Sequence, residues 1–290
     1  MTTAKGADVV RTVAELRERV RAVKQAGRVV SLVPTMGALH EGHLSLIRQA
    51  RQQSDFVVMS LFVNPTQFNE QKDLAAYPRT EAADVAAAGA AGCELVFAPD
   101  VSEMYPAGFG TTIDAGPISL PLEGEARGPV HFRGVATVVA KLFNMVAPDI
   151  AFFGQKDAQQ TLVVRRMVRD LDMPVDVRIC ETVREPDGLA MSSRNVRLSA
   201  DARVKALGLI AALRAAETAL HNGEHNGDAL VALGMRTLES HGIEANAVDY
   251  FAIADIETLA PVHTVRTPVL LAVAAHVGGV RLIDNVIWRP

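Results

Sequence analysis

The sequence predicts an α/β protein: a doubly wound, Rossmann-like parallel sheet domain over residues 1–182, followed by a smaller, lid-like α+β domain over residues 183–290. Two observations predict the first domain. Its strand-like runs are apolar nearly throughout, as in parallel strands buried on both faces, and they alternate with helical stretches. A third observation, the loss of this alternation near residue 184, predicts the second domain.

The first strand–helix–strand unit spans residues 28–63. The β-branched run RVVSLVPT, residues 28–35, predicts a strand that ends in a glycine-bearing turn. Helical spacing of apolar residues predicts a helix over about 43–53. The next run, FVVMSLFV at 56–63, has no polar alternation and predicts a strand buried on both faces.

The same rhythm continues through the rest of the first domain. Its further elements, in order, are an alanine-rich helix at about 80–91, a strand at 94–99, a strand at 149–154, a helix at 157–172 and a strand at 175–180. Repeated strand–helix–strand units of this kind build a parallel sheet with helices on both faces.

The second domain begins where a polar Asp187-Gly188 turn and a Ser-Ser pair interrupt the rhythm. Two helices are predicted at about 200–221 and 227–240, followed by strands at 248–255 and 269–277. Helices and strands that do not alternate are typical of an α+β domain.

Composition favours a small-molecule substrate. The 290 residues carry a formal net charge of −4 and no Lys/Arg-rich run, so the basic surface typical of nucleic-acid-binding proteins is not expected. Cys93 and Cys180 lie far apart in mostly apolar stretches, which predicts buried, inert thiols. Neither a leader-like amino terminus nor about 18 consecutive apolar residues occurs, so we expect a cytoplasmic protein without a membrane span.

The first candidate site is PTMGALHEGH, residues 34–43, where the first strand passes into the first helix. His40 and His43 stand three apart on one side of the first helical turn, and free backbone N–H groups at a helix start suit phosphate. Gly37 and Gly42 lack a Cβ, so a nucleotide could approach the backbone closely. We therefore favour phosphate binding. Two alternatives are that the histidines only cap the helix, or that they bind zinc, for which further ligands are missing.

A second candidate is FFGQKDAQQ, residues 152–160, at the end of another predicted parallel strand and hence at the same sheet edge. Lys156 could place a point charge on phosphate oxygens. Asp157 and Gln160 fit a helix capping box, and this local role is about as well supported as a role in a site.

A third candidate is AMSSRN, residues 190–195, in which two hydroxyls and the Arg194 guanidinium could grip an anion. Two further polar sets are Asn64 and Gln67 after the second strand, and the RGPVHFRG segment with Arg127, His131 and Arg133. Asn64-Pro65 is also an ordinary turn signal.

These segments together resemble the pantothenate synthetase family. The resemblance is carried in order by PTMGALHEGH, SLFVNPTQF, YPRT, HFRGV, FFGQKD, AMSSRN and RLIDN, from about Val29 to Asn285. The His-x-Gly-His and Met-Ser-Ser-Arg elements are shared with the wider nucleotidyltransferase superfamily that includes class I aminoacyl-tRNA synthetases. SLFVNPTQF and FFGQKDAQQ narrow the resemblance to the one family.

The resemblance implies a ligase reaction in two steps. ATP with Mg²⁺ adenylates the carboxylate of pantoate and releases pyrophosphate, and the amine of β-alanine then attacks the acyl adenylate to give pantothenate and AMP. It also implies a homodimer, and a second domain that closes over ATP. No resident metal ligand and no nucleophilic side chain is expected.

The resemblance also implies residue roles. Gln67 and Gln160 should bind pantoate, Gln67 should lie near β-alanine, and His43 stands where the family has a proton donor. The catalytic set should be His40, His43, Lys156, Ser192, Ser193 and Arg194. ATP should be bound by Met36, Gly37, Ala38, Leu39, His40, Glu41, Gly42, His43, Gly154, Gln155, Lys156, Asp157, Val183, Met191, Ser192, Ser193 and Arg194.

The sequence departs from the family pattern at two places. The segment from Arg127 to His131 is one residue longer than the family's Arg-Pro-Gly-His-Phe, so their roles stay open, and Gln155 stands where an acidic residue is frequent. The same segments leave two other functions open. One is a nucleotidyltransferase that makes a dinucleotide. The other is a tRNA-binding relative without catalysis, and the acidic balance of the sequence argues against it.

Overall fold

A six-stranded parallel sheet forms the centre of the first domain in the computed structural model, which describes residues 6–68 and 71–290. The strand order is β1-β4-β3-β2-β5-β6. Their bounds are β1 Asp8–Val10, β2 Val30–Thr35, β3 Phe56–Leu61, β4 Leu95–Phe97, β5 Ile150–Gly154 and β6 Asp176–Cys180. The predicted doubly wound, Rossmann-like sheet is confirmed.

The side of the sheet to which the chain adds strands changes between β2 and β5. From β2 the chain adds β3 and then β4 on one side, and it later adds β5 and β6 on the other. β2 pairs with β3 from Val30↔Phe56 to Thr35↔Leu61, and with β5 at Ser31↔Ile150 and Leu32↔Ala151. In open parallel sheets a ligand binds beyond the carboxyl ends of the strands at such a reversal.

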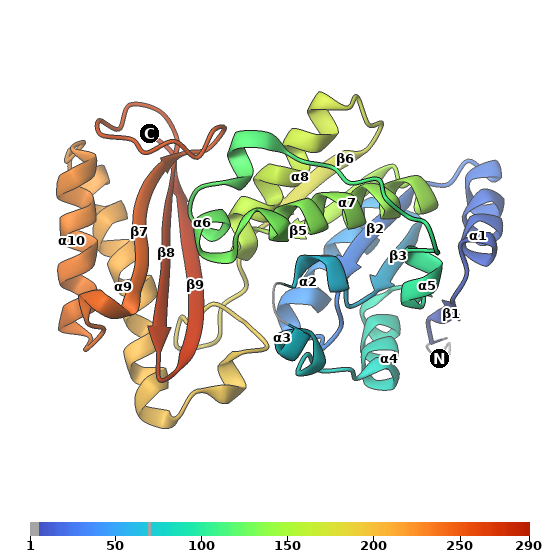
Figure 1. The fold of residues 1–290 in the computed structure, drawn as a ribbon, viewed down its shortest axis with the longest axis horizontal. Coiled ribbons are helices and arrows are strands. Elements are labelled where there is room, and N and C mark those ends of the chain that lie inside the picture. Colours follow the sequence, from blue (N-terminus) through green and yellow to red (C-terminus); the bar gives the residue numbers. More distant parts are fainter. Residues whose placement is uncertain (1–5, 69–70) are drawn as a thin grey trace.

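Helices cover both faces of this sheet (Figure 1). One face carries α1 (Val13–Gln25), α7 (Pro129–Val146) and α8 (Ala158–Asp170), and the other carries α2 (Glu41–Gln53) and α4 (Glu81–Ala91). Strand residues alternate between the two cores: Leu32 packs with α7, and its neighbour Val33 packs with α2.

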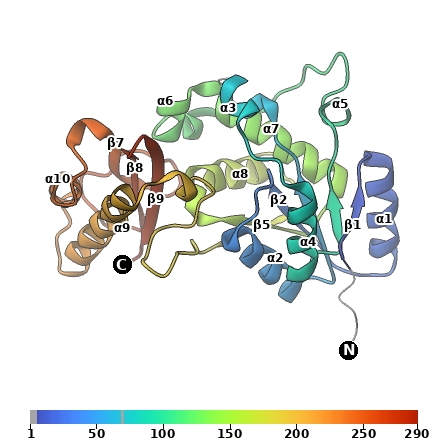
Figure 2. The ribbon, with the colours of Figure 1, turned by 90° about the horizontal axis from the view of Figure 1, so that it is seen from below.

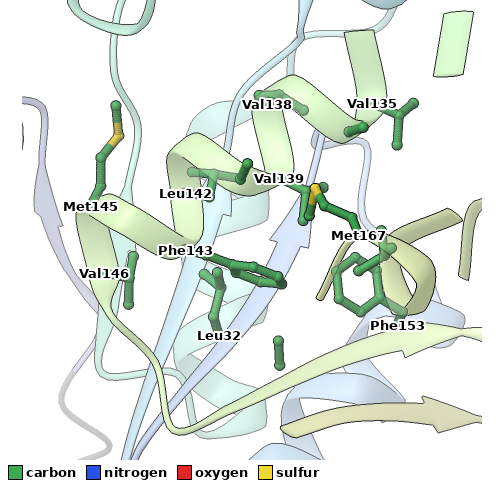
Figure 3. Close-up of a cluster of buried hydrophobic side chains, with 14 of the residues drawn as sticks. Leu32, Val135, Val138, Val139, Leu142, Phe143, Met145, Val146, Phe153 and Met167 are labelled. Atoms are coloured by element: carbon green, nitrogen blue, oxygen red, sulfur yellow. The ribbon is translucent and has the colours of Figure 1, made fainter. Parts of the chain in front are cut away.

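Helix α7 supplies much of the first core. Its apolar residues at helical spacing turn toward the sheet, and Figure 3 shows Phe143 next to Leu32, Met167 beside Val139, and Phe153 beside Met167. The Phe143 and Phe153 rings meet edge to face with centroids 6.4 Å apart. This packing fixes β5, whose carboxyl end carries the Lys156 segment.

The second domain pairs two helices with an antiparallel sheet. Helices α9 (Ala200–His221) and α10 (Gly227–Ser240) pack against each other and against strands β7 (Val248–Asp255), β8 (Val269–Val277) and β9 (Val280–Trp288) (Figure 2). The predicted α+β class is confirmed. The other face of this sheet meets the first domain, because Leu270 and Ala272 belong to the same buried cluster as Phe132 and Phe153.

Short helices fill the connections. They are η1 Pro65–Gln67, α3 Gln71–Ala75, α5 Val101–Met104, η2 Gly116–Ser119, α6 Glu123–Arg127, η3 Gln155–Asp157, η4 Asn195–Arg197 and η5 Ala245–Ala247. Two predicted helix starts shift: α2 begins at Glu41, two residues early, and the helix expected from Asp157 begins as η3 before α8. Sequence reasoning missed β1, α1, α7 and β9.

Cys93 and Cys180 are both buried and unpaired, as predicted. Burial raises the pKa of the Cys93 thiol to about 12 and that of Cys180 to about 11, so both stay protonated. Across the part of the chain described, no helix has the length and apolar character to cross a membrane. The amino-terminal residues 1–5, on which the expectation of no leader partly depended, lie outside the described residues.

Candidate functional site

A cavity of about 570 Å³ opens at the reversal point of the sheet and extends to the second domain. It brings together most of the residues that the sequence singled out. Those that line it are Met36, His40, Gly42, His43, Asn64, Gln67, Arg127, His131, Gly154, Lys156, Asp157, Gln160, Val183, Met191, Ser192, Ser193 and Arg194.

Five predicted ATP-site residues do not line the cavity: Gly37, Ala38, Leu39, Glu41 and Gln155. Glu41 points to the surface and pairs with Arg48. Gln155 instead donates from Nε2 to the Oδ1 of Asn285 at 3.2 Å, which ties the first domain to β9.

The turn at Gly37–Leu39 is filled by a carboxylate of the protein. The N–H groups of Ala38 and Leu39 donate to the two oxygens of Asp84 at 3.0 and 2.9 Å. Gly37 has φ +84°, and a Cβ there would lie 2.8 Å from Leu61 and 3.0 Å from Asp84. These N–H groups are therefore satisfied by Asp84, and the missing Cβ of Gly37 leaves room for the side chains of Leu61 and Asp84.

His40 and His43 cap helix α2 and also face the cavity. The Nδ1 of His40 accepts from the Gly42 N–H at 3.2 Å, and the Nδ1 of His43 accepts from the His40 N–H at 3.4 Å. With both Nδ1 atoms used as acceptors, each neutral ring carries its proton on Nε2. Both histidines therefore cap the helix, and the same contacts direct the Nε2–H tautomer of each ring.

His43 is held neutral. Burial, and then the neighbouring His40 with its ring centroid 4.2 Å away, lower the pKa of His43 to about 3. Burial also lowers the pKa of His40, and the charge of Lys156 lowers it further. At neutral pH the pair offers N–H hydrogen bonds without positive charge.

Lys156 and Asp157 come from the segment after β5. Lys156 Nζ lies 3.6 Å from a carboxylate oxygen of Asp157. Asp157 occupies the N-cap position of α8 but makes no capping hydrogen bond, so the expected capping box with Gln160 is not formed. The segment is anchored instead by Asn285, whose Nδ2 donates to the carbonyls of Gln155 and Lys156, each at 3.0 Å.

The Ser192–Arg194 turn forms the opposite wall. The Arg194 N–H donates to Ser192 Oγ at 3.2 Å, and the Met191 N–H donates to the Val183 carbonyl at 3.0 Å. Burial lowers the pKa of Arg194, and the charge of Arg127 lowers it further. A desolvated guanidinium beside another cation is well suited to bind an anion.

Gln67 and Gln160 lie in the same cavity with the polar groups after β3. Gln67 accepts from the amide of the buried Asn64 at 3.1 Å and directs its own Nε2 to the Met36 sulfur at 3.0 Å. His131 Nδ1 donates to the Gln67 carbonyl at 2.8 Å, which leaves its Nε2 as an acceptor.

Of Arg127, His131 and Arg133, the three polar residues named in RGPVHFRG, only Arg133 does not line the cavity, and it pairs with Asp114 at the surface. Sequence reasoning missed the cavity residues Tyr77, Glu123 and Tyr250, and also Asp84, which supports the turn before α2 from outside the cavity. Tyr77 lies in the quoted YPRT motif, so that motif could have indicated it. Asp84 binds the turn before α2 through Ala38, and Glu123 and Tyr250 bind each other; these contacts join residues far apart in the sequence, so no local pattern indicates them.

Among the described residues, no group of three or more His, Cys, Asp or Glu side chains is arranged to hold a metal ion. Lys156 and Arg127 from the first domain and Arg194 from the second nevertheless all act on the Asp157 carboxylate. Desolvation raises the pKa of Asp157, but these three charges outweigh it and lower the pKa. Hydrogen-bond donors and cations around one cavity can bind a polyanion, and the amides beside them can bind a polar organic acid.

Comparison with known proteins agrees with this chemistry. A model of the family described as pantoate-beta-alanine ligase matches residues 8–287. The pantothenate synthetase of Roseiflexus sp. (strain RS-1) is 54% identical over 277 residues, which cover 96% of this chain and 98% of that protein. The enzyme of Moorella thermoacetica is 50% identical over 280 residues, 97% of this chain and 98% of that protein.

Solved structures give the same result. The crystal structure of pantothenate synthetase from Thermus thermophilus superposes with a TM-score of 0.89 at 46% identity, covering 98% of this chain and 100% of that one. A Francisella tularensis pantoate-beta-alanine ligase, complexed with beta-gamma ATP and beta-alanine, has a TM-score of 0.77 at 30% identity and covers 97% of each chain.

Proposed function

The chain belongs to the pantoate-β-alanine ligase family, a family of amide-forming ligases, and from that premise we propose that it joins pantoate to β-alanine by way of pantoyl adenylate. In the first step a pantoate carboxylate oxygen attacks the α-phosphorus of ATP, and pyrophosphate leaves. In the second step the amine of β-alanine attacks the activated carbonyl carbon, the C–O bond to the phosphate breaks, and AMP leaves.

The observation that carries this proposal is the convergence of two kinds of group on one cavity. The anion-binding groups are the Nε2–H groups of His40 and His43, Lys156, and the Ser192–Arg194 turn. The Gln67 and Gln160 amides lie in the same cavity. Positioned donors of this kind stabilise the charge that develops as a carboxylate displaces pyrophosphate.

The substrates divide between these groups. We assign ATP to the predicted set that lines the cavity, with His40, His43, Lys156, Ser192, Ser193 and Arg194 as the catalytic residues. Pantoate is assigned to Gln67 and Gln160, whose amides both donate and accept, and β-alanine to the side of Gln67. The Francisella relative's complex with beta-gamma ATP and beta-alanine supports ATP and β-alanine as substrates.

Mg²⁺ enters this proposal as part of the ATP substrate. The ion is usually held by one or two carboxylates together with phosphate oxygens and water. Asp157, on the cavity wall beside Lys156, is a carboxylate placed to take part. The ion's contribution is to neutralise charge on the departing pyrophosphate.

Two features of the setting are also proposals. We infer a cytoplasmic homodimer that acts on small molecules and not on nucleic acid, because the family resemblance implies a dimer and the sequence has no basic run.

A product-release assay tests the proposal. With ATP, pantoate and β-alanine the enzyme should release AMP and pyrophosphate in equal amounts, and omission of either acid should abolish AMP release. AMP formation that does not need pantoate would contradict the proposal and favour a nucleotidyltransferase. Salt-sensitive RNA binding without turnover would favour a tRNA-binding relative instead.

A further inference from the structure

Glu123 joins the two domains at the edge of the cavity. It lies in α6 of the first domain, with its side chain only 9% exposed. Its carboxylate accepts from Arg127 Nε at 2.7 Å, from Arg281 Nη1 and Nη2 at 2.8 and 2.7 Å, and from the Tyr250 hydroxyl at 2.9 Å. Arg281 and Tyr250 belong to β9 and β7 of the second domain.

The carboxylate stays ionised in this setting. Burial raises the pKa of Glu123, but the hydrogen bonds from Arg281 and the charges of Arg127 and Arg281 outweigh burial and lower it to about 2. A buried carboxylate is tolerated when its oxygens are fully used in this way. Arg281 has a second carboxylate as well, since its Nε donates to Asp249 at 2.6 Å.

Of the two arginines bound by Glu123, Arg127 is the one that lines the cavity. Its charge reaches both Arg194 and Asp157. At Arg194 burial lowers the pKa most, and the charge of Arg127 lowers it further. At Asp157 the charge of Lys156 lowers the pKa against desolvation, and the charge of Arg127 adds to this effect. Arg127 is thus a third cation on the cavity wall beside Lys156 and Arg194.

We propose that Arg127 binds phosphate oxygens of ATP, and that Glu123 is the residue that positions it. This inference rests on the proposed function. A guanidinium fixed through Nε on one carboxylate has a defined orientation, which suits its fork-shaped donors to a phosphate. Because Tyr250 and Arg281 hold the other side of Glu123, the second domain supports the placement of Arg127.

Steady-state kinetics with each substrate varied in turn test the assignment. Arg127→Ala should lower kcat/KM for ATP by about 100-fold, the usual effect of removing one preorganised donor, while the KM for pantoate changes less than about threefold. Arg127→Lys keeps the charge but lacks the fork-shaped donors, so its kcat/KM for ATP should lie between the values of the parent and of Arg127→Ala. A defect confined to the KM for pantoate would overturn the assignment of Arg127 to phosphate.

A double-mutant comparison tests the role of Glu123. Glu123→Gln removes the charge but keeps the shape, and should lower kcat/KM for ATP about tenfold. Because Glu123 acts through Arg127, the double variant should be no worse than Arg127→Ala alone. If the losses in kcat/KM of the two single variants multiply in the double variant, the positioning role of Glu123 is contradicted.

Asp249→Asn is the matched control. It removes a carboxylate from Arg281 but leaves Glu123 and Arg127 paired, so kcat/KM for ATP should stay within about twofold of the parent. A loss equal to that of Glu123→Gln would show a general effect of domain packing and overturn the proposal. Arg127→Ala keeps Glu123 bound to Arg281, so its result stands even where Glu123→Gln unfolds.

The two proposals fail in different ways. If the ligase reaction is wrong, the parent enzyme releases no pantoate-dependent AMP. If only the present inference is wrong, the parent enzyme is active and Arg127→Ala retains its kcat/KM for ATP.

Discussion

His40 and His43 show that one pair of side chains can serve local structure and a site together. Their Nδ1 atoms cap α2, and this leaves Nε2–H donors on two neutral rings. The sequence placed both residues at a helix start and offered capping and phosphate binding as alternatives. Spacing alone could not show that capping determines which nitrogen carries the proton.

The depressed pKa of His43 makes stability depend on pH. Its pKa is about 3 in the folded protein against an ordinary value of 6.5, so below about pH 6.5 the unfolded chain binds a proton that the folded protein does not. The contribution of His43 to the free energy of unfolding is therefore fully present above about pH 6.5 and falls as the pH is lowered. Between pH 7 and pH 5 it falls by about 1 to 2 kcal/mol.

Urea unfolding at pH 7 and pH 5 measures this effect. In His43→Asn the Oδ1 can still accept from the His40 N–H, but nothing titrates at position 43. The variant should lose less stability than the parent over this range, by about 1 to 2 kcal/mol. Equal losses in both proteins would show that His43 takes up a proton in the folded state as readily as in the unfolded one.

Asp84 is a residue that could not have been predicted from its surroundings in the sequence. It lies in α4, which contributes no cavity residue, and reaches the turn 46 positions earlier to accept from the N–H of Ala38. Its carboxylate is buried and also accepts from Thr80 Oγ1 at 3.0 Å. The turn it supports carries φ +52° at Ala38, which costs energy in a residue with a Cβ.

We expect Asp84→Ala to loosen this turn. Two backbone N–H groups lose their acceptors, so the free energy of unfolding should fall by about 2 to 4 kcal/mol and kcat/KM for ATP by about tenfold or more. Asp84→Asn keeps one acceptor oxygen and should be intermediate on both measures. A fully active and stable Asp84→Ala would mean that water or another group satisfies these N–H donors.

At the level of elements, apolar runs buried on both faces predicted β2, β3 and β5 within a residue or two, because a central parallel strand has no polar face. The edge strand β6 was also placed within a residue, although Asp176 and Arg178 are exposed on it. Strand β9 was missed, although Gly278-Gly279 between two apolar runs is a two-residue hairpin signal, with φ +56° and +75°. The polar stretch RLIDN within β9 was interpreted only as a family motif and not as part of a strand.

Helix α7 was missed for a related reason. Its first two turns hold His131 and Arg133 of RGPVHFRG, a segment that was interpreted as a candidate site. Pro129 at the first helical position after Gly128 is a helix-start signal that was available. The helix places His131 and Phe132 on the cavity and sends Arg133 to the surface.

The anchoring of η3 by β9 gives a prediction at this scale. Asn285→Ala removes two hydrogen bonds to the carbonyls of Gln155 and Lys156, and should raise the KM for ATP about tenfold by releasing Lys156. Asn285→Asp should be worse than Ala, because it would place a carboxylate against the same two carbonyls. ATP titration with each variant checks the order, and an Asp variant equal to the parent would contradict it.

Across the whole molecule, the cavity belongs to both domains. Its histidines, Lys156 and the two glutamines come from the parallel sheet domain, while the Ser192–Arg194 turn comes from the segment after it. We propose that residues 183–290 close over ATP and keep water from the acyl adenylate. Tyr250 and Leu270 also line the cavity, so the sheet of the second domain is already part of its wall.

What the sequence could not supply at this scale is the contact between domains. Each of the three candidate anion-binding segments was a weak signal alone, and the predicted parallel sheet indicated only that two of them share an edge. Bonds such as Arg281 to Glu123 join residues 158 positions apart. No pattern of local spacing encodes such pairs.

Oxygen labelling of pantoate tests carboxylate activation most directly. Pantoate with ¹⁸O in its carboxylate is incubated with ATP, β-alanine and the enzyme, and the products are examined by mass spectrometry. If the carboxylate oxygen attacks the α-phosphorus, one ¹⁸O must remain on AMP when the amine displaces it. We expect one labelled oxygen in AMP for each pantothenate formed. Unlabelled AMP, with the label in pyrophosphate or phosphate, would contradict the adenylate route.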